Sequence, residues 1–315
     1  MIIFIVSKIC KALLALLICT GAITGPATDA PIVFKDSENI RMSAVIFSDT
    51  HIADTAFSPY YLECGLQDVN NSQEKFDAFI ISGDITEMSD MNSYENTWKV
   101  IDEAAAFENI ILATGNHDIR LFYKDRTEYI MKKQAEYAGK EITTPYYSID
   151  VNGYTVIVIN SDEWQLERAV ISDAQLKFLD SELARATMDG KPVFVVAHQP
   201  LADTHGLPEV WATGGDLGAQ SYQVREILTK YTNVFFLNGH LHTGIYEKSL
   251  EVLDEEKGVY SLNLPPYGKK STRGQFKQNG LGVYVEVYDD EVIFTARDFK
   301  TGTPLEGCSR AFALK

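Results

Sequence analysis

Histidines are unevenly distributed along this chain of 315 residues. Five of the six stand at or just after the ends of short apolar runs, and only His205 does not. Carboxylates and one amide share this placement, so that the set comprises Asp49, His51, Asp84, Asn116, His117, Asp118, His198, His240 and His242. One such histidine is commonly a structural residue, but five of six at equivalent positions are hard to attribute to packing.

These donor types indicate a metal site. Imidazole nitrogens, carboxylates and an amide oxygen, without thiolates, suit borderline divalent ions such as Mn, Fe, Zn, Ni or Co. Seven of the residues are candidate ligands, too many for one ion: Asp49, His51, Asp84, Asn116, His198, His240 and His242. Two ions that share one carboxylate would take four protein contacts each. Two metal ions about 3.5–4 Å apart can hold the attacking and leaving oxygens in phosphate-ester hydrolysis, so we expect a dinuclear centre.

The elements that must position these residues alternate between strand-like and helix-like segments. Six short apolar runs are rich in β-branched and aromatic residues, as in strands buried on both faces, at 43–49, 76–84, 109–116, 154–162, 191–198 and 233–240. Helix-like segments lie between them, at 93–107, 124–138, 172–186 and 220–231. This alternation predicts an α/β fold. Parallel strands bring their carboxyl ends to one edge of a sheet, where ligands bind, so the polar residues should converge there.

The C-terminal part of the chain has a different pattern. Segments at 257–267, 280–290 and 291–299 read as strands joined by short turns, with Asp289 and Asp290 at a hairpin turn. These strands should be antiparallel and complete the second of two sheets. No linker rich in Pro, Gly or Ser separates them from the rest, so we treat residues 30–315 as one domain.

The ordered motifs resemble those of the calcineurin-like metallophosphoesterase family. They read SDTH (48–51), GD (83–84), GNHD (115–118), AHQP (197–200) and GHLH (239–242). Single motifs are weak, whereas the ordered set is highly specific. The resemblance implies an α/β fold of the αββα type, in which two sheets form a sandwich with helices outside and a dinuclear centre lies at the strand ends.

The resemblance also implies a role for each residue. The first metal would be bound by Asp49, His51, Asp84 and His242, and the second by Asp84, Asn116, His198 and His240. Asp84 would therefore bridge the ions. His117 is similar to the family's non-ligand histidine, which contacts the phosphate and protonates the leaving group. Asp118 would orient His117 as a second catalytic residue, or else cap the following helix.

The implied reaction is attack on phosphorus by a hydroxide that bridges the two metals, with a phosphodiester or a phosphomonoester as substrate. Purple acid phosphatases place a tyrosine ligand three residues after the GD aspartate, where this chain has Glu87, so we do not expect that branch. The segment 160–186 looks like the branch that includes bacterial cyclic-nucleotide phosphodiesterases and glycerophosphodiesterases.

Residues 1–29 have the order of a secretory signal. Lys8 and Lys11 precede an uncharged run, and small residues follow, with candidate cleavage after Ala22 or Ala27. An uncleaved membrane anchor is the alternative, because the run is nearly as long as the ~20 residues that span a bilayer. We therefore expect an exported protein, either free outside the cytoplasm or attached to a membrane. In an oxidising compartment a disulfide between Cys64 and Cys308 is permitted.

The formal net charge of −16 indicates which class of substrate the protein can bind. An acidic surface repels polyanions, so we expect a small phosphate ester rather than a long nucleic acid. Two alternatives stay open: a nucleotidase or nuclease of the same fold, and a non-catalytic binding protein. Insertions at 54–75, 119–150 and 203–222 should wall the pocket. In the last of these, Trp211 would either stack on a substrate or pack under the loop, and we expect His205 at the surface.

Overall fold

The structure is a computed structural model that describes residues 30–55, 57–104, 107–212 and 214–315. The predicted signal peptide or anchor at 1–29 lies outside these residues and stays a prediction. None of the described helices is both long and apolar enough to span a membrane. Cys64 and Cys308 are both free, so the permitted disulfide is not formed.

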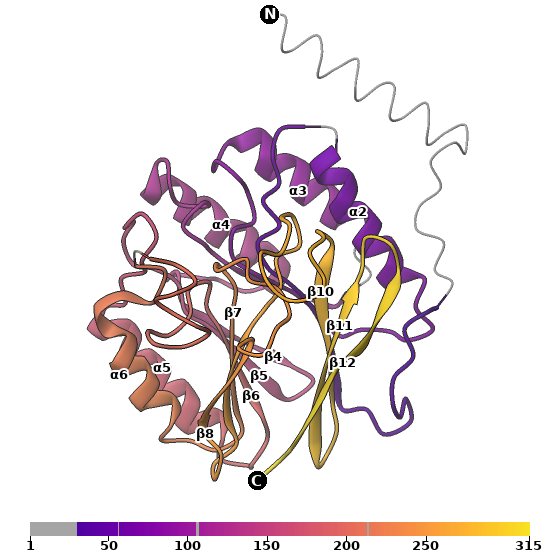
Figure 1. The fold of residues 1–315 in the computed structure, drawn as a ribbon. Helices are drawn as coiled ribbons and strands as arrows, with labels where there is room; N and C mark the ends of the chain where they lie inside the picture. The colour runs from indigo at the N-terminus through magenta and orange to yellow at the C-terminus, as the bar shows by residue number, and fades with distance from the viewer. Residues whose placement is uncertain (1–29, 56, 105–106, 213) are drawn as a thin grey trace, which may run out of the picture.

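Two six-stranded sheets form the centre of the fold (Figure 1). The first has the order β12-β11-β10-β1-β2-β3 and the second β4-β5-β6-β7-β9-β8. The first sheet consists of β1 (Met42–Phe47), β2 (Ala78–Ser82), β3 (Asn109–Ala113), β10 (Leu281–Val287), β11 (Glu291–Asp298) and β12 (Thr303–Ala313). The second consists of β4 (Tyr147–Val151), β5 (Tyr154–Val158), β6 (Val193–Val196), β7 (Val234–Asn238), β8 (Leu250–Asp254) and β9 (Val259–Asn263).

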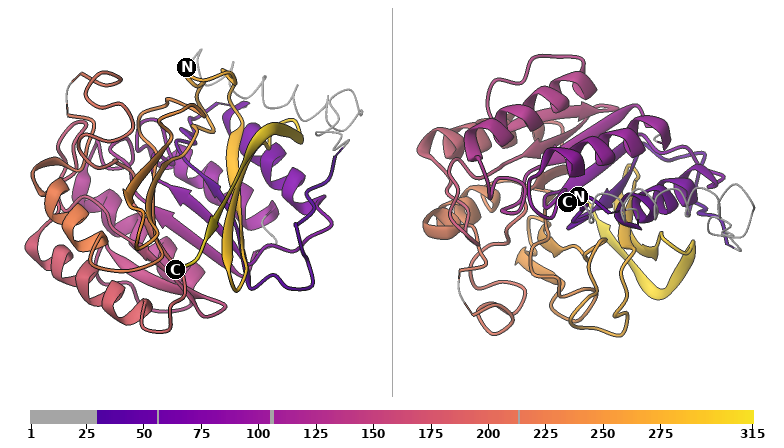
Figure 2. Two further views of the ribbon diagram at one scale, coloured as in Figure 1. Left: turned by 60° about the horizontal axis from the view of Figure 1, so that its bottom comes forward. Right: turned by 90° about the horizontal axis from the view of Figure 1, so that it is seen from above.

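Helices cover the outer face of each sheet, as the further views show (Figure 2). The helices are α2 (Phe57–Asn70), α3 (Met91–Ala104), α4 (Tyr123–Ala138), α5 (Asp173–Ala186) and α6 (Ser221–Leu228), with a short 3-10 turn η1 (Gly218–Gln220). Alternate strand residues face opposite sides. In β1, Ile46 therefore packs between the sheets, and Val45 and Phe47 pack in the cluster that includes α2 and α3. A third cluster joins α5 and α6 to the second sheet. The predicted αββα sandwich is thus confirmed.

The predicted elements appear with small shifts of their ends. All six apolar runs are strands and all four helix-like segments are helices. At the start of α5 the Ser172 hydroxyl accepts a hydrogen bond from the backbone amide of Gln175 at 3.3 Å and so caps the helix. The C-terminal strands β10 to β12 are antiparallel and complete the sheet that contains β1. Strand β9, which we expected within this antiparallel tail, instead pairs in parallel with β7 in the other sheet.

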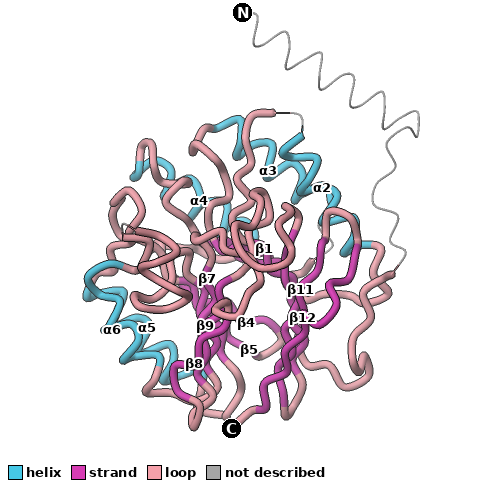
Figure 3. Tube along the Cα trace, viewed as in Figure 1, coloured by secondary structure: helices cyan, strands magenta, loops and turns pink. Residues whose placement is uncertain are grey.

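The parallel strands of both sheets end at the same edge of the sandwich. In the first sheet β1, β2 and β3 are parallel, and in the second β5, β6 and β7 are. A hydrogen bond joins the two sheets at this edge, where Ser82 Oγ donates to the Ala197 carbonyl at 3.0 Å. Loops cover this edge of the sandwich (Figure 3).

Candidate metal centre

Each predicted ligand from a strand end follows its strand by two or three residues. Asp49, Asp84, His198 and His240 are the second residues after β1, β2, β6 and β7, and Asn116 is the third after β3. His51 and His242 come two residues after Asp49 and His240. Because these strands end at one edge and the residues follow them at similar distances along the chain, residues almost two hundred positions apart come into contact.

The four predicted ligands of the first metal form one group. Asp49, His51, Asp84 and His242 each offer a ligand atom, and these atoms lie within 4.8 Å of one another. His242 Nε2 lies 3.0 Å from Asp49 Oδ1 and 3.1 Å from His51 Nε2. His51 Nε2 is in turn 3.5 Å from Asp84 Oδ2. Two imidazole nitrogens and two carboxylates that point at one place are a fitting set for a borderline divalent ion.

The second group contains Asp84, His198 and His240, whose ligand atoms again lie within 4.8 Å of one another. Two side-chain atoms, Asn116 Oδ1 and His240 Nε2, are buried without a hydrogen-bond partner among the described residues, and a third, His198 Nε2, faces the carboxylate of Asp84. Buried polar atoms are rarely left unpaired, because each costs about 1–3 kcal/mol. These three atoms are the non-bridging ligand atoms expected for the second metal, so the residues present fit a second ion.

Asp84 is common to these two groups, as a bridging ligand must be, whereas a third group of possible donors, His51, Glu87 and His117, does not contain it. Burial opposes its ionisation, but His198 and His51 hold the pKa of Asp84 well below its usual range. Burial would also lower the pKa of His198, yet Asp84 and Asp49 raise it to about 10. The Nδ1–H of His198 donates to the Ser82 carbonyl at 2.9 Å, which directs Nε2 toward Asp84, 3.2 Å away. A carbonyl that accepts a hydrogen bond from the other ring nitrogen in this way orients a metal-binding histidine.

The backbone at the site is strained. Five of the seven predicted ligands have a positive φ: Asp49, His51, Asp84, His240 and His242. Such conformations cost of order 1–3 kcal/mol each and persist where surrounding contacts determine them. One such contact is the His240 amide, which lies 3.2 Å from both carboxylate oxygens of Asp49. Strained backbone concentrated on the donor residues supports a functional role for them.

Glycines allow the backbone to pass close to the donor side chains. A Cβ on Gly115 would lie 2.1 Å from Asp84 Oδ1, and one on Gly239 would lie 1.9 Å from Ser48 Oγ and 2.5 Å from Asp49 Oδ2. A side chain at either position would displace a carboxylate of the site. Close approach of the backbone explains these glycines.

His117 is held by Glu87 rather than by Asp118. His117 Nδ1 lies 2.7 Å from the Glu87 carbonyl, which can only accept, so Nδ1 carries the proton and Nε2 is left free. The carboxylate of Asp118 accepts from the backbone amides of Ile85, Thr86 and Gly115 at 2.9–3.0 Å. Helix α4 begins only at Tyr123.

Neither predicted role of Asp118 is therefore met in this structure. It does not orient His117, and it does not cap the next helix. Instead it ties the loop after β2 to the loop after β3, and it is fully buried. Burial, with the charge of Asp84 close by, raises the pKa of Asp118 to about 6.

Two carboxylates at the centre were not predicted from the sequence. Glu87 was noted only for the tyrosine it replaces, but its Oε2 lies 2.9 Å from His51 Nδ1 and 2.6 Å from Lys269 Nζ. Burial raises the pKa of Glu87, but His51 and Lys269 lower it to about 2 overall. Lys269 belongs to the basic segment 265–277, and this ion pair ties that segment to the site.

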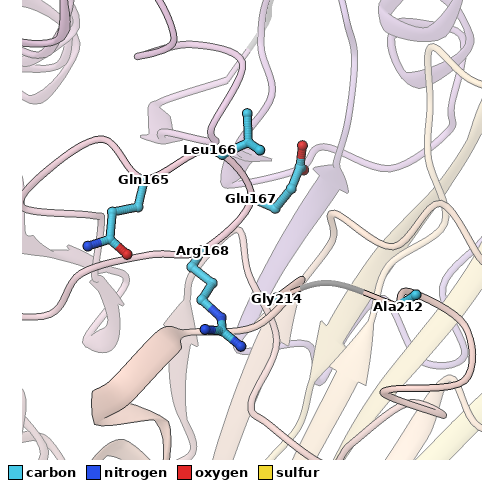
Figure 4. A pocket seen from close by; sticks show the side chains of 6 residues that line it. All are labelled: Gln165, Leu166, Glu167, Arg168, Ala212 and Gly214. Atoms are coloured by element: carbon cyan, nitrogen blue, oxygen red, sulfur yellow. The ribbon is translucent and has the colours of Figure 1, made fainter.

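The second missed carboxylate is Glu167. Its Oε2 accepts from Asn116 Nδ2 at 3.3 Å and lies 3.8 Å from His240 Nε2. It also borders a cavity of about 540 Å³ between the loop 161–172 and the loop that contains Ala212 and Gly214 (Figure 4). A lone glutamate in a loop carries no sequence signal that would have identified it.

The loop 199–217 supplies the rest of the wall. The Trp211 ring lies 4.9 Å from the His240 ring and 6.4 Å from the His242 ring, so it packs against the predicted ligands. The expectation that His205 is a surface residue was wrong. His205 is fully buried, with Nδ1 2.8 Å from the Lys248 carbonyl and Nε2 2.8 Å from Ser261 Oγ.

We expect His205 to make stability depend on pH below neutrality. Burial lowers the pKa of His205 from 6.5 to about 4. As the pH falls, His205 therefore binds a proton in the unfolded chain at a higher pH than in the folded protein. The contribution of His205 to the free energy of unfolding is therefore fully present above its unfolded pKa. It is lost as the pH falls from 6.5 to 4, and at about pH 5 the loss amounts to about 2 kcal/mol. Urea denaturation of the wild type and of H205N at neutral and mildly acidic pH measures this loss. The same loss in both proteins would contradict the assignment.

The family model for calcineurin-like phosphoesterases matches residues 42–244, which contain the whole centre. The chain therefore belongs to the calcineurin-like phosphoesterase family and is a phosphoric ester hydrolase. It is 27% identical over 274 residues to a protein of Rhodococcus erythropolis named "Probable cyclic nucleotide phosphodiesterase", with 83% of this chain and 86% of that protein covered.

Solved structures share the fold. A dimetal phosphatase from Danio rerio matches with a TM-score of 0.64 at 14% identity, over 88% of this chain and 100% of that one. A purple acid phosphatase from yellow lupin matches with a TM-score of 0.57 at 15% identity, over 86% of this chain and 53% of that one. At these identities the likeness shows the architecture alone.

Proposed function

We propose that this protein hydrolyses phosphate esters of small molecules with two divalent metal ions, which Asp84 bridges. One observation carries the proposal: Asp84 belongs to two groups of buried donor atoms, and Asn116 Oδ1 and His240 Nε2 are buried without a hydrogen-bond partner among the described residues. A descendant of the fold that no longer binds metal would have no need to keep these atoms unpaired. The mixed nitrogen and oxygen donors favour Mn, Fe, Zn, Ni or Co.

Bound at this centre, two metal ions would neutralise the charge of the phosphoryl oxygens and acidify a water molecule for attack on phosphorus. The chain supplies the remaining functions. The Glu87 carbonyl accepts from His117 Nδ1–H, so Nε2 is the available ring nitrogen, and when the ring is doubly protonated Nε2–H can deliver a proton to the leaving oxygen. Trp211 covers the rings of His240 and His242 and limits the access of bulk water to them.

Phosphodiesters, cyclic nucleotides among them, are the first substrates to test. The name of the Rhodococcus erythropolis relative supports this class. The net charge of −16 supports a small ester over a long nucleic acid. A nucleotidase of the same fold is the alternative that the same experiment would identify.

Purified protein supplied with Mn²⁺ should be assayed with p-nitrophenyl phosphate, bis-p-nitrophenyl phosphate, cyclic nucleotides and mononucleotides. Hydrolysis of at least one small ester is expected, and its loss on chelation should be reversed by Mn²⁺. Hydrolysis of mononucleotides alone would favour the nucleotidase. No hydrolysis of any ester by protein that contains two ions per chain would contradict the proposal.

A further inference from the structure

Glu167 places a carboxylate beside the second group of donors. It lies in the loop between β5 and α5, and its Oε2 is 3.3 Å from Asn116 Nδ2 and 3.8 Å from His240 Nε2. The Glu167 carbonyl accepts from Gln199 Nε2 at 3.4 Å, so the backbone is held as well. The side chain is 21% exposed, so a ligand that enters the centre meets it.

No lysine or arginine of the described residues pairs with this carboxylate. Among the residues that the structure describes, no lysine or arginine nitrogen lies within 4.0 Å of it. The neighbouring Arg168 points away from Glu167 toward Gly214 (Figure 4), and its Nε lies 3.6 Å from Asp216 Oδ1. A Cβ on Gly214 would lie 2.6 Å from Arg168 Nε, which shows how closely the arginine packs on that loop. A carboxylate that no basic side chain pairs with adds negative charge to a site that must attract a phosphate.

The charge would act differently on the two ester classes. A phosphodiester carries one negative charge, whereas a phosphomonoester at mildly alkaline pH carries two. A carboxylate a few ångströms from the phosphoryl oxygens repels the second charge as strongly as the first, and in a partly buried site this repulsion is only partly screened. The cavity of about 540 Å³ that Glu167 borders leaves room for the second substituent of a diester.

We propose that Glu167 is a specificity-determining residue that disfavours dianionic phosphomonoesters and so selects phosphodiesters. This inference rests on the proposed hydrolysis of phosphate esters, and it names the ester class. Glu167 acts here through its charge on the substrate. Its hydrogen bond with Asn116 keeps the carboxylate at the centre.

The test compares E167Q with the wild type, because glutamine keeps the shape and the acceptor for Asn116 and removes the charge. The matched control is E163Q, which makes the same charge change at an exposed residue of the same loop. In E167Q the ratio of kcat/KM for bis-p-nitrophenyl phosphate to that for p-nitrophenyl phosphate should fall about tenfold, with most of the change in the monoester. In E163Q the ratio should stay as in the wild type.

Binding of inorganic phosphate gives a readout that does not need turnover. Calorimetry at mildly alkaline pH should show that the phosphate dianion binds Mn²⁺-loaded E167Q about tenfold more tightly than it binds the wild type. Unchanged ester ratios and phosphate affinity in E167Q would overturn the inference. A loss of one metal ion per chain in E167Q, measured by elemental analysis, would also overturn it, since Glu167 would then hold the metal. Failure of the wild type to hydrolyse any ester would count against the proposed function, and phosphate binding would still test Glu167.

Discussion

Replacement of Asp84 by asparagine is expected to lower phosphate-ester hydrolysis on the order of a thousandfold or more, the largest effect of any single substitution. Asp84 belongs to both donor groups and is 1% exposed. Its Oδ2 lies 3.2 Å from His198 Nε2 and 3.5 Å from His51 Nε2, between the two predicted ion positions. Asparagine has one oxygen and no charge, so it cannot bridge two cations. Loss of several kcal/mol of metal assistance gives a change of this size.

Elemental analysis beside the rate measurement separates this effect from unfolding. D84N should contain fewer than two ions per chain and keep a cooperative thermal transition. D118N is the matched control, because Asp118 is equally buried and binds the same loops, but through backbone amides. It should lose stability while it retains both ions. Full metal content and full activity in D84N would show that Asp84 does not bind the metal ions.

Replacement of His117 by alanine should lower kcat about a hundredfold to ten-thousandfold, the range for loss of a general acid. Metal content should stay near that of the wild type, because His117 is not a predicted ligand. Its Nδ1–H is held by the Glu87 carbonyl and its amide donates to Asp84 Oδ1 at 2.9 Å. The backbone bond to Asp84 survives the substitution, which leaves the bridging carboxylate in place.

The leaving group distinguishes the two roles open to His117. p-Nitrophenolate departs readily without a proton, whereas an alkoxide does not. If His117 protonates the leaving oxygen, H117A should lose far more activity toward alkyl esters and cyclic nucleotides than toward p-nitrophenyl esters. An equal loss for both would mean that His117 binds the phosphate instead. Loss of metal from H117A would place His117 among the ligands.

The convergence of the seven candidate ligands could be predicted because it depends on topology. Parallel strands end at one edge, and a residue two positions beyond a strand end, such as Asp49 or His240, has little freedom to lie elsewhere. The α/β class followed from the alternation of strands and helices, whereas the two-sheet sandwich was implied by the family resemblance. The parallel pairing of β9 with β7 was missed, because apolar patterning does not report strand direction.

The roles of Glu87, Asp118 and Glu167 could not be predicted, because they depend on which way side chains point within loops. Asp118 follows His117 in the sequence, yet its carboxylate faces the amides of the loop after β2. His205 lies in a polar insertion, and its burial depends on partners more than forty residues away. Contacts of this kind produce no periodic pattern in the sequence from which they could be predicted.

The central claim is that two metal ions per chain are needed for the hydrolysis of phosphate esters. The most direct measurement is the activity toward bis-p-nitrophenyl phosphate as Mn²⁺ is titrated into protein stripped of metal and verified by elemental analysis. We predict no activity in the stripped protein and full activity only when two equivalents are bound. Full activity in the stripped protein, or a plateau at one equivalent, would contradict the claim.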